Sequence, residues 1–168
     1  MRPFISSFFL LIAFTSFAQN LPNKQKMNYQ ELGAPIPPFV LEKTMGGVLT
    51  NTQLKKDKSV MLMIFNPQCD HCELMVDSLK RIAANFKNTQ IIMVAEHSNK
   101  DFMKDFISKT GIATLPLFQN IGTERGKFIP YVYTNHILPQ INFYNSDYKL
   151  IKTFTGNSTL DSIKMFIQ

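Results

Sequence analysis

Two cysteines, Cys69 and Cys72, stand where the hydrophobic pattern of the chain changes its period. Before them, residues 60–65 form a continuous apolar run, which is typical of a strand buried on both faces of a covered sheet. After them, apolar residues recur at the spacing of one helix face. These are Met75, Leu79, Ile82 and Phe86. A second apolar run, residues 90–95, then predicts another buried strand. This order predicts a right-handed crossover between parallel strands, with its helix beginning at or near Cys69.

The chain before this unit predicts a short N-terminal extension of the sheet. Residues 33–38 contain three prolines, which push the preceding residues out of helical geometry, so we expect an extended, turn-rich segment. Residues 39–41 then have the pattern of a short edge strand. Gly46 and Gly47 are expected to turn the chain into a partner at residues 48–49.

The chain after this unit predicts a second helix and a hairpin. Residues 99–110 are amphipathic, whereas residues 111–135 have no clean period and are expected to be mixed helix and loop. Residues 140–144 and 150–154 alternate as the two strands of an antiparallel hairpin. Residues 158–161 resemble a capping box, which predicts a final short helix.

Residues 1–18 have the pattern of a cleavable secretory signal. One basic residue, Arg2, precedes an apolar run, and the segment ends in the small-x-small sequence Ser16-Phe17-Ala18. An uncleaved membrane anchor is the alternative, although the apolar run is shorter than the roughly 20 residues that a spanning helix needs. No other stretch is apolar enough to span a bilayer. Residues 19–32 are polar and predict a flexible lead before a single domain at residues 33–168.

The sequence Cys69-Asp70-His71-Cys72 is suited to reversible disulfide chemistry. On the first turn of a helix the two sulfurs reach each other, and the free N–H groups and the helix dipole favour the thiolate of the first cysteine. We therefore predict that Cys69 is the nucleophile and that Cys72, one turn deeper, is the resolving thiol. A protonated His71 would make the pair more oxidising, whereas Asp70 would have the opposite effect.

The strand-CxxC-helix unit, the segment Gly33-Ala34-Pro35 and a late hairpin introduced by Leu138-Pro139 together resemble a thioredoxin-like protein. The sequence is most similar to the exported TlpA/ResA-type thiol-disulfide oxidoreductases, over roughly residues 33–168. The resemblance implies an α/β thioredoxin-like fold, with a central mixed sheet flanked by helices and an N-terminal strand extension. It also implies that Pro139 is a cis-proline facing the cysteine pair, which leaves the backbone of Leu138 free to pair with a substrate strand.

Several positions depart from thioredoxin itself. Met63 stands where thioredoxins have an acid beneath the cysteines, and Gln68 replaces the Trp before the first cysteine. The residues between the cysteines are Asp-His instead of Gly-Pro, and Leu138 is bulkier than the usual Thr, Ser or Val. These departures favour a narrower substrate range than that of a general reductase. We predict that Glu73 and His136 supply the missing proton relay.

The resemblance implies a thiol-disulfide oxidoreductase of the bacterial cell envelope or periplasm that acts on protein thiols and disulfides. No organic cofactor and no metal is needed, because Cys69 and Cys72 carry the electrons. In an oxidising compartment a reductase needs electrons from a membrane relay, whereas an oxidase needs re-oxidation. Relatives of this type are generally reductants, so we expect reduction of protein disulfides, with oxidation as the alternative direction.

Several other functions fit the sequence less well. A structural disulfide between the two cysteines would close a short loop and restrain little of the chain. Covalent haem attachment needs His directly after the second cysteine, where Glu73 stands. The net charge of +6 is spread along the chain, and its densest basic stretch, residues 55–58, contains an acid and lacks interleaved aromatic residues. Nucleic-acid binding is therefore not expected.

The strongest alternative is a metallochaperone of the Sco type. Two thiolates and the imidazole of His136 or His97 would suit Cu(I) or Zn(II). The cysteines of Sco-type proteins are usually separated by three residues, whereas two residues separate them here. Each histidine also has a plain structural alternative, as a solvated or hydrogen-bonded loop residue.

Overall fold

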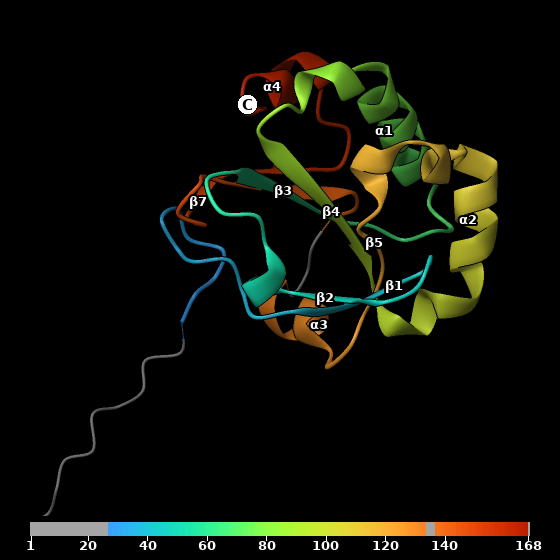
Figure 1. Ribbon diagram of the computed structural model, residues 1–168, viewed down its shortest axis with the longest axis horizontal. Coiled ribbons are helices and arrows are strands. Elements are labelled where there is room, and N and C mark those ends of the chain that lie inside the picture. The colour runs from blue at the N-terminus through green and yellow to red at the C-terminus, as the bar shows by residue number, and fades with distance from the viewer. Residues whose placement is uncertain (1–26, 134–136, 168) are drawn as a thin grey trace, which may run out of the picture.

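The computed structural model describes residues 27–133 and 137–167. Within them, a seven-stranded mixed sheet runs in the order β2-β1-β5-β4-β3-β6-β7 (Figure 1). Its strands are β1 Val40–Lys43, β2 Val48–Thr50, β3 Ser59–Ile64, β4 Thr89–Ala95, β5 Ile121–Glu124, β6 Gln140–Tyr144 and β7 Leu150–Thr155. The α-helices are α1 Asp70–Arg81, α2 Met103–Thr110, α3 Phe128–Val132 and α4 Leu160–Lys164. Short 3-10 helices are η1 Asn51–Gln53, η2 Ala83–Asn85, η3 His97–Phe102, η4 Ile112–Thr114 and η5 Pro116–Phe118. The expected mixed sheet with flanking helices and an N-terminal strand extension is confirmed.

The strand β3 lies in the interior of the sheet, between β4 and β6. It pairs in parallel with β4 and antiparallel with β6. All six residues of β3 are buried, as the continuous apolar run predicts. The chain passes from β3 through α1 to the parallel neighbour β4, so the predicted crossover is confirmed.

One face of the sheet is covered by α1, α2 and α4, while α3 lies on the opposite side (Figure 1). The helix α1 contributes four buried side chains to the first core: Cys72, Met75, Val76 and Leu79. They pack with Met61 and Met63 of β3. The helix ends at Arg81, so Phe86 does not lie on it as its spacing predicts. Phe86 reaches the same core from the end of η2.

The opposite face is covered by the extended segment before β1 and by α3. Apolar side chains of this segment and of the α3 region pack against the other face of β3. They include Ile36, Phe39, Phe128, Ile129 and Tyr133, which meet Val60, Leu62 and Ile64. The sheet therefore separates two apolar cores, and the polar residues between Cys69 and Cys72 lie outside both.

Backbone hydrogen bonds fasten the segment before β1 to the hairpin of β6 and β7. The N–H of Gly33 donates to the carbonyl oxygen of Leu150 at 2.8 Å, and that of Ile36 donates to Tyr148 at 2.9 Å. In return, the N–H of Leu150 donates to Ala34 at 2.8 Å. These hydrogen bonds hold residues 33–36 against the sheet.

Two expectations about strands are wrong. The strand β1 is not an edge strand, because it pairs with β2 on one side and β5 on the other. The edge position belongs to β2. In addition, β5 lies in the region predicted to be mixed helix and loop. Its Gly122 passes so close to β1 that a Cβ atom would lie 1.9 Å from the Glu42 carbonyl oxygen, so the strand has a glycine where apolar alternation is expected.

The predicted helix at residues 99–110 divides into η3 and α2. The last helix is capped by Thr159, whose side chain accepts a hydrogen bond from the N–H of Ser162, and not by the expected box of residues 158–161. That helix ends at Lys164. No helix in the described part of the chain is both long and apolar enough to cross a membrane. The predicted signal at residues 1–18 lies outside the described residues.

Candidate redox-active site

A tight turn carries the chain from β3 to the first cysteine. The side-chain oxygen of Asn66 accepts a hydrogen bond from the N–H of Gln68 at 2.9 Å, and its carbonyl oxygen accepts from Cys69 at 3.1 Å. An Asn side chain that bonds the backbone two residues ahead stabilises such turns. The strand therefore ends and the helix begins within a few residues, at the edge where the parallel strands have their carboxyl ends.

Cys69 is the N-cap of α1, so the expectation that the helix begins at or near this residue is confirmed. Its extended backbone allows its carbonyl oxygen to accept the N–H groups of Cys72 at 2.9 Å and Glu73 at 3.2 Å. Cys69 is half-buried, whereas Cys72 is fully buried in the first core. The two thiols are free. The more accessible sulfur is thus at the helix start and the other is one turn deeper.

The environment of Cys72 favours its protonated form. Burial raises the pKa of this thiol well above the ordinary value, and the neighbouring Cys69 and Glu73 raise it further. A backbone hydrogen bond from Asn66 acts in the opposite direction but is the smaller effect. Cys72 therefore remains a neutral thiol near pH 7 and needs a proton acceptor before it can act as a nucleophile.

The strand β3, which is described in full, contains no acid. Met63 of β3 is fully buried in the same core as Cys72, together with Met75 and Val76 of α1. These side chains offer the thiol no strong proton acceptor. The strand β3 therefore supplies no carboxylate that could take the proton of Cys72.

The polar residues of the helix start differ in exposure. Asp70 and His71 are exposed. The carboxylate of Glu73 is mostly buried and forms an ion pair with Lys109 of α2, with Oε2 and Nζ 2.6 Å apart. Of the two predicted relay residues, Glu73 is thus adjacent to the cysteines, while His136 lies outside the described residues.

The loop before β6 lies beside the end of β3. Ile64 pairs with Gln140 in the antiparallel ladder. Pro139, the residue before Gln140, therefore lies just beyond the end of β3, next to the turn that leads to Cys69. The peptide bond between Leu138 and Pro139 is cis, as the resemblance implies. Pro139 is buried and its carbonyl oxygen accepts the N–H of Gly156 at 3.0 Å. The role of Leu138 and Pro139 in facing a substrate stays a prediction.

A groove of about 190 Å³ lies beside the helix start. Its walls come from α1 and from the loop between β7 and α4. They comprise His71, Leu74, Met75, Ser78, Gly156, Asn157 and Ser158. Leu74 is 63% exposed and gives this groove an apolar wall. In the sequence it is an apolar residue off the buried face of the helix.

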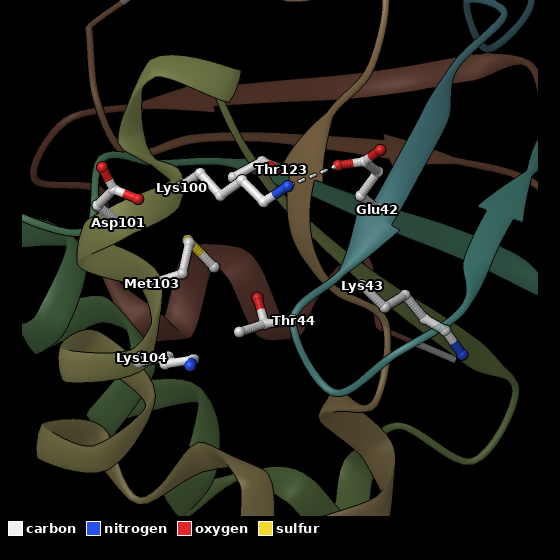
Figure 2. A pocket seen from close by; sticks show the side chains of 8 residues that line it. All are labelled: Glu42, Lys43, Thr44, Lys100, Asp101, Met103, Lys104 and Thr123. Carbon is white, nitrogen blue, oxygen red and sulfur yellow. Dashed lines mark hydrogen bonds and ion pairs between the residues drawn. The ribbon is translucent and has the colours of Figure 1, made fainter.

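A larger pocket of about 410 Å³ lies elsewhere, between the end of β1, the start of α2 and β5 (Figure 2). Thr44, Met103 and Lys104 line it, and Lys100 reaches across it to the carboxylate of Glu42 (Figure 2). It contains neither cysteine. Among the described residues, no three His, Cys, Asp or Glu side chains are grouped so that they would hold a metal ion.

Two buried polar side chains are also absent from the sequence-based site. Glu124, at the end of β5, accepts a hydrogen bond from the N–H of Ile129 at 2.8 Å, and burial raises the pKa of its carboxyl. Asn142 of β6 accepts hydrogen bonds from Gln140 and Thr153, while its amide nitrogen has no hydrogen-bond partner among the described residues. Both lie on the sheet face opposite α1, so they are not neighbours of Cys72.

No family model and no curated protein matches the chain. Solved structures match it in fold. The thioredoxin domain of a thiol-disulfide oxidoreductase from Bacteroides vulgatus is 16% identical, with a TM-score of 0.67, and the match covers 82% of this chain and 99% of that one. A thiol:disulfide interchange protein DsbE from Chlorobium tepidum is 17% identical, with a TM-score of 0.64 and coverage of 80% and 95%. StoA from Bacillus subtilis is 15% identical, with a TM-score of 0.57 and coverage of 80% and 98%. The chain therefore has the thioredoxin-like fold, as structures of thiol-disulfide oxidoreductases do.

Proposed function

We propose that the protein is a thiol-disulfide oxidoreductase that exchanges electrons with protein thiols through Cys69 and Cys72. The observation that carries this proposal is the pairing of a half-buried cysteine at the N-cap of α1 with a buried cysteine one turn deeper. The loop of Leu138 and Pro139 before β6 ends next to the same turn, which supports the use of this edge for substrates. The two sulfurs carry the electrons, so no organic cofactor or metal takes part.

The reaction needs two displacement steps. The Cys69 thiolate attacks one sulfur of a substrate disulfide, which forms a mixed disulfide and releases the first substrate thiolate. Cys72 then loses its proton and attacks Cys69 Sγ, which forms the Cys69-Cys72 disulfide and releases the second substrate thiolate. Two electrons pass to the substrate, and the reverse sequence would oxidise a dithiol.

We propose that the chain is exported to a bacterial cell envelope and works there in the reducing direction. The signal-like pattern of residues 1–18 supports export. A reductase in an oxidising compartment has to be recharged, so a membrane-bound electron relay would return the Cys69-Cys72 disulfide to the dithiol.

A glutathione redox titration tests the proposal, with free thiols at Cys69 and Cys72 counted at each potential. A midpoint near the roughly −270 mV of thioredoxin would support a reductant. A midpoint near the roughly −120 mV of strong periplasmic oxidants would reverse the proposed direction. A pair that does not cycle with glutathione but binds Cu(I) or Zn(II) tightly would replace this function with metal delivery.

A further inference from the structure

An ion pair joins the helix that carries the cysteines to its neighbour. Lys109, in the last turn of α2, places its Nζ 2.6 Å from Oε2 of Glu73 in α1. Glu73 directly follows Cys72, and its N–H donates to the carbonyl oxygen of Cys69 at 3.2 Å. The Glu73 side chain is 18% exposed, whereas that of Lys109 is 65% exposed. The carboxylate is therefore fixed against the first turn of α1 by a cation that approaches from solvent.

The charges around the cysteine pair are unevenly distributed. The helix α1 supplies two acids, Asp70 and Glu73, and the exposed His71. The neighbouring helix α2 supplies Lys109. The loop before β6 supplies the apolar Leu138 and Pro139, and β3 supplies Met63. In the part of the chain that the structure describes, Lys109 is the cation that forms an ion pair with an acid of this turn.

These charges act on the release step, in which Cys72 has to ionise. The negative charge of Glu73 raises the pKa of the Cys72 thiol in addition to the effect of burial. Lys109 interacts electrostatically with both Glu73 and Asp70, and the two acids raise the pKa of Lys109. A cation bonded to Glu73 cancels much of the field that this acid exerts on a neighbouring sulfur.

We propose that Lys109 is a positioning residue that holds the Glu73 carboxylate, offsets its charge and thereby speeds the step in which Cys72 displaces the substrate. The proposal rests on the function proposed above. In that step the Cys72 S–H gives its proton to water or a buffer base, and Cys72 Sγ bonds to Cys69 Sγ. The bond between Cys69 and the substrate breaks, and its electron pair leaves on the substrate thiolate.

A purely structural role for this pair would have different consequences. Lys109 is 65% exposed, and an ion pair with so exposed a partner contributes little to folding stability, so loss of Lys109 should scarcely change the unfolding midpoint. The effect of Lys109 should instead appear in the rate and the pH profile of the release step. It should also require the Glu73 charge, because Lys109 acts through that residue.

The test uses the reduced full-length protein and the neutral disulfide 4,4′-dithiodipyridine in a stopped-flow spectrometer. The first equivalent of pyridinethione reports attack by one cysteine, and the second, unimolecular phase reports displacement by the other. A Cys72→Ser variant, which should give only the first phase, assigns them. Because the reagent is uncharged, a changed surface charge does not alter its approach to the protein.

The variants are Lys109→Gln, Lys109→Arg, Glu73→Gln and the double variant Glu73→Gln with Lys109→Gln. Lys104→Gln is the matched control, because Lys104 is an exposed lysine of the same helix and has no ion-pair partner among the described residues. We expect Lys109→Gln to slow the second phase at pH 7 by about threefold to tenfold. The plot of its rate against pH should shift to higher pH by about half a unit to one unit. Lys109→Arg should restore the rate, and Lys104→Gln should match the wild type.

The double variant decides the mechanism. If Lys109 acts through Glu73, then Lys109→Gln has no further effect in the Glu73→Gln background. An unchanged second phase in Lys109→Gln, or the same slowing with and without Glu73, would overturn the inference while the proposed function stands. A wild-type protein that releases only one equivalent would overturn the proposed function, and the inference would fall with it.

Discussion

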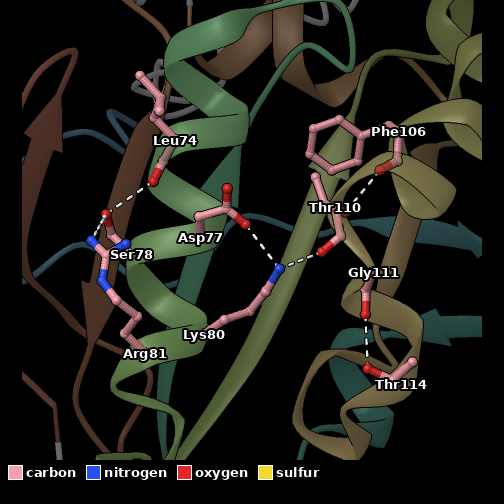
Figure 3. A network of polar contacts seen from close by, with 9 residues as sticks. All are labelled: Leu74, Asp77, Ser78, Lys80, Arg81, Phe106, Thr110, Gly111 and Thr114. Carbon is pink, nitrogen blue, oxygen red and sulfur yellow. Dashed lines mark hydrogen bonds and ion pairs between the residues drawn. The ribbon is translucent and has the colours of Figure 1, made fainter.

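The ammonium group of Lys80, in the last turn of α1, donates a hydrogen bond to the carbonyl oxygen of Thr110, the last residue of α2 (Figure 3). Lys80 also pairs with Asp77 of its own helix at 2.8 Å. A cation at the C-terminal end of a helix compensates carbonyl groups that lack a partner within the helix. The two helices α1 and α2 are thus joined at two places. Lys80 of α1 bonds to Thr110 of α2, and Lys109 of α2 pairs with Glu73 of α1.

Removing the ammonium group of Lys80 should weaken the domain. We expect Lys80→Met, which keeps most of the aliphatic stem, to lower the free energy of unfolding by about 1 kcal/mol, because the Thr110 carbonyl loses a charged donor. Urea denaturation measures this change. Lys164→Met is a suitable control, since its ion pair with Asp161 lies at the surface and should contribute less than about 0.5 kcal/mol. Equal losses in both variants would contradict the assigned role of Lys80.

Single replacement of the two cysteines should block different steps of the reaction. Cys69→Ser should abolish disulfide exchange, because the accessible sulfur is lost. Cys72→Ser should accumulate a mixed disulfide with substrate, because no second thiol is present to release it. Mass spectrometry of each variant after incubation with a disulfide peptide distinguishes the two outcomes. A mixed disulfide trapped by the Cys69 variant would reverse the assigned roles.

The stability of the reduced protein should depend on pH through Cys72. Burial raises the pKa of this thiol in the folded chain, so the folded chain keeps a proton that the unfolded chain releases above the ordinary value of 9.0. The free energy of unfolding should therefore fall as the pH rises beyond about 9, by up to about 1.4 kcal/mol per pH unit. Urea midpoints between pH 7 and 10 measure this slope. Cys72→Ala should lose this contribution, and an identical slope in that variant would contradict it.

Glu124 should couple stability to pH in the carboxyl range. Burial raises the pKa of its carboxyl in the folded protein, so stability is larger at low pH and falls as the pH rises through the folded value. Glu124→Gln keeps an oxygen that accepts the N–H of Ile129 and removes the charge, so it should flatten this dependence. Glu124→Leu leaves that N–H without its acceptor and should cost about 1–3 kcal/mol. Denaturation of the three proteins at pH 4 and pH 7 provides the comparison, and parallel pH dependence in all three would exclude Glu124 as its source.

Strands were predictable from the sequence where burial on both faces leaves a continuous apolar run. β3 and β4 have this property because each lies between two other strands and has an apolar core on either face. β5 does not, since its residues Ile-Gly-Thr-Glu contain a glycine required by close contact with β1 and a glutamate buried against α3. These requirements come from partners about 80 residues earlier and a few residues later in the chain, and no local pattern reports the first of them.

In the candidate site too, some features follow from a local sequence pattern and others depend on the fold. The spacing of Cys69 and Cys72 at a strand-helix junction is local, so it predicted a helix that begins at or near Cys69 and a second sulfur one turn deeper. The structure adds that Cys69 is the N-cap and that Cys72 is buried. The contact between Glu73 and Lys109 joins two helices that are packed together only by the fold. A surface lysine in an amphipathic helix gives no sign of its partner, which is why Lys109 was absent from the predicted site.

The hydrogen bonds of Gly33 and Ile36 also determine at which end of the sheet the N-terminal segment enters the domain. They attach the chain to Tyr148 and Leu150, beside the turn of the hairpin. That turn lies at the start of β3, because Tyr144 pairs with Val60, whereas the cysteines follow the end of the same strand. Six strand residues, about 20 Å, separate the two ends. The chain therefore enters the domain through Gly33 at the end of β3 remote from the two sulfurs, so a carrier protein fused before Gly33 would leave Cys69 accessible to other proteins.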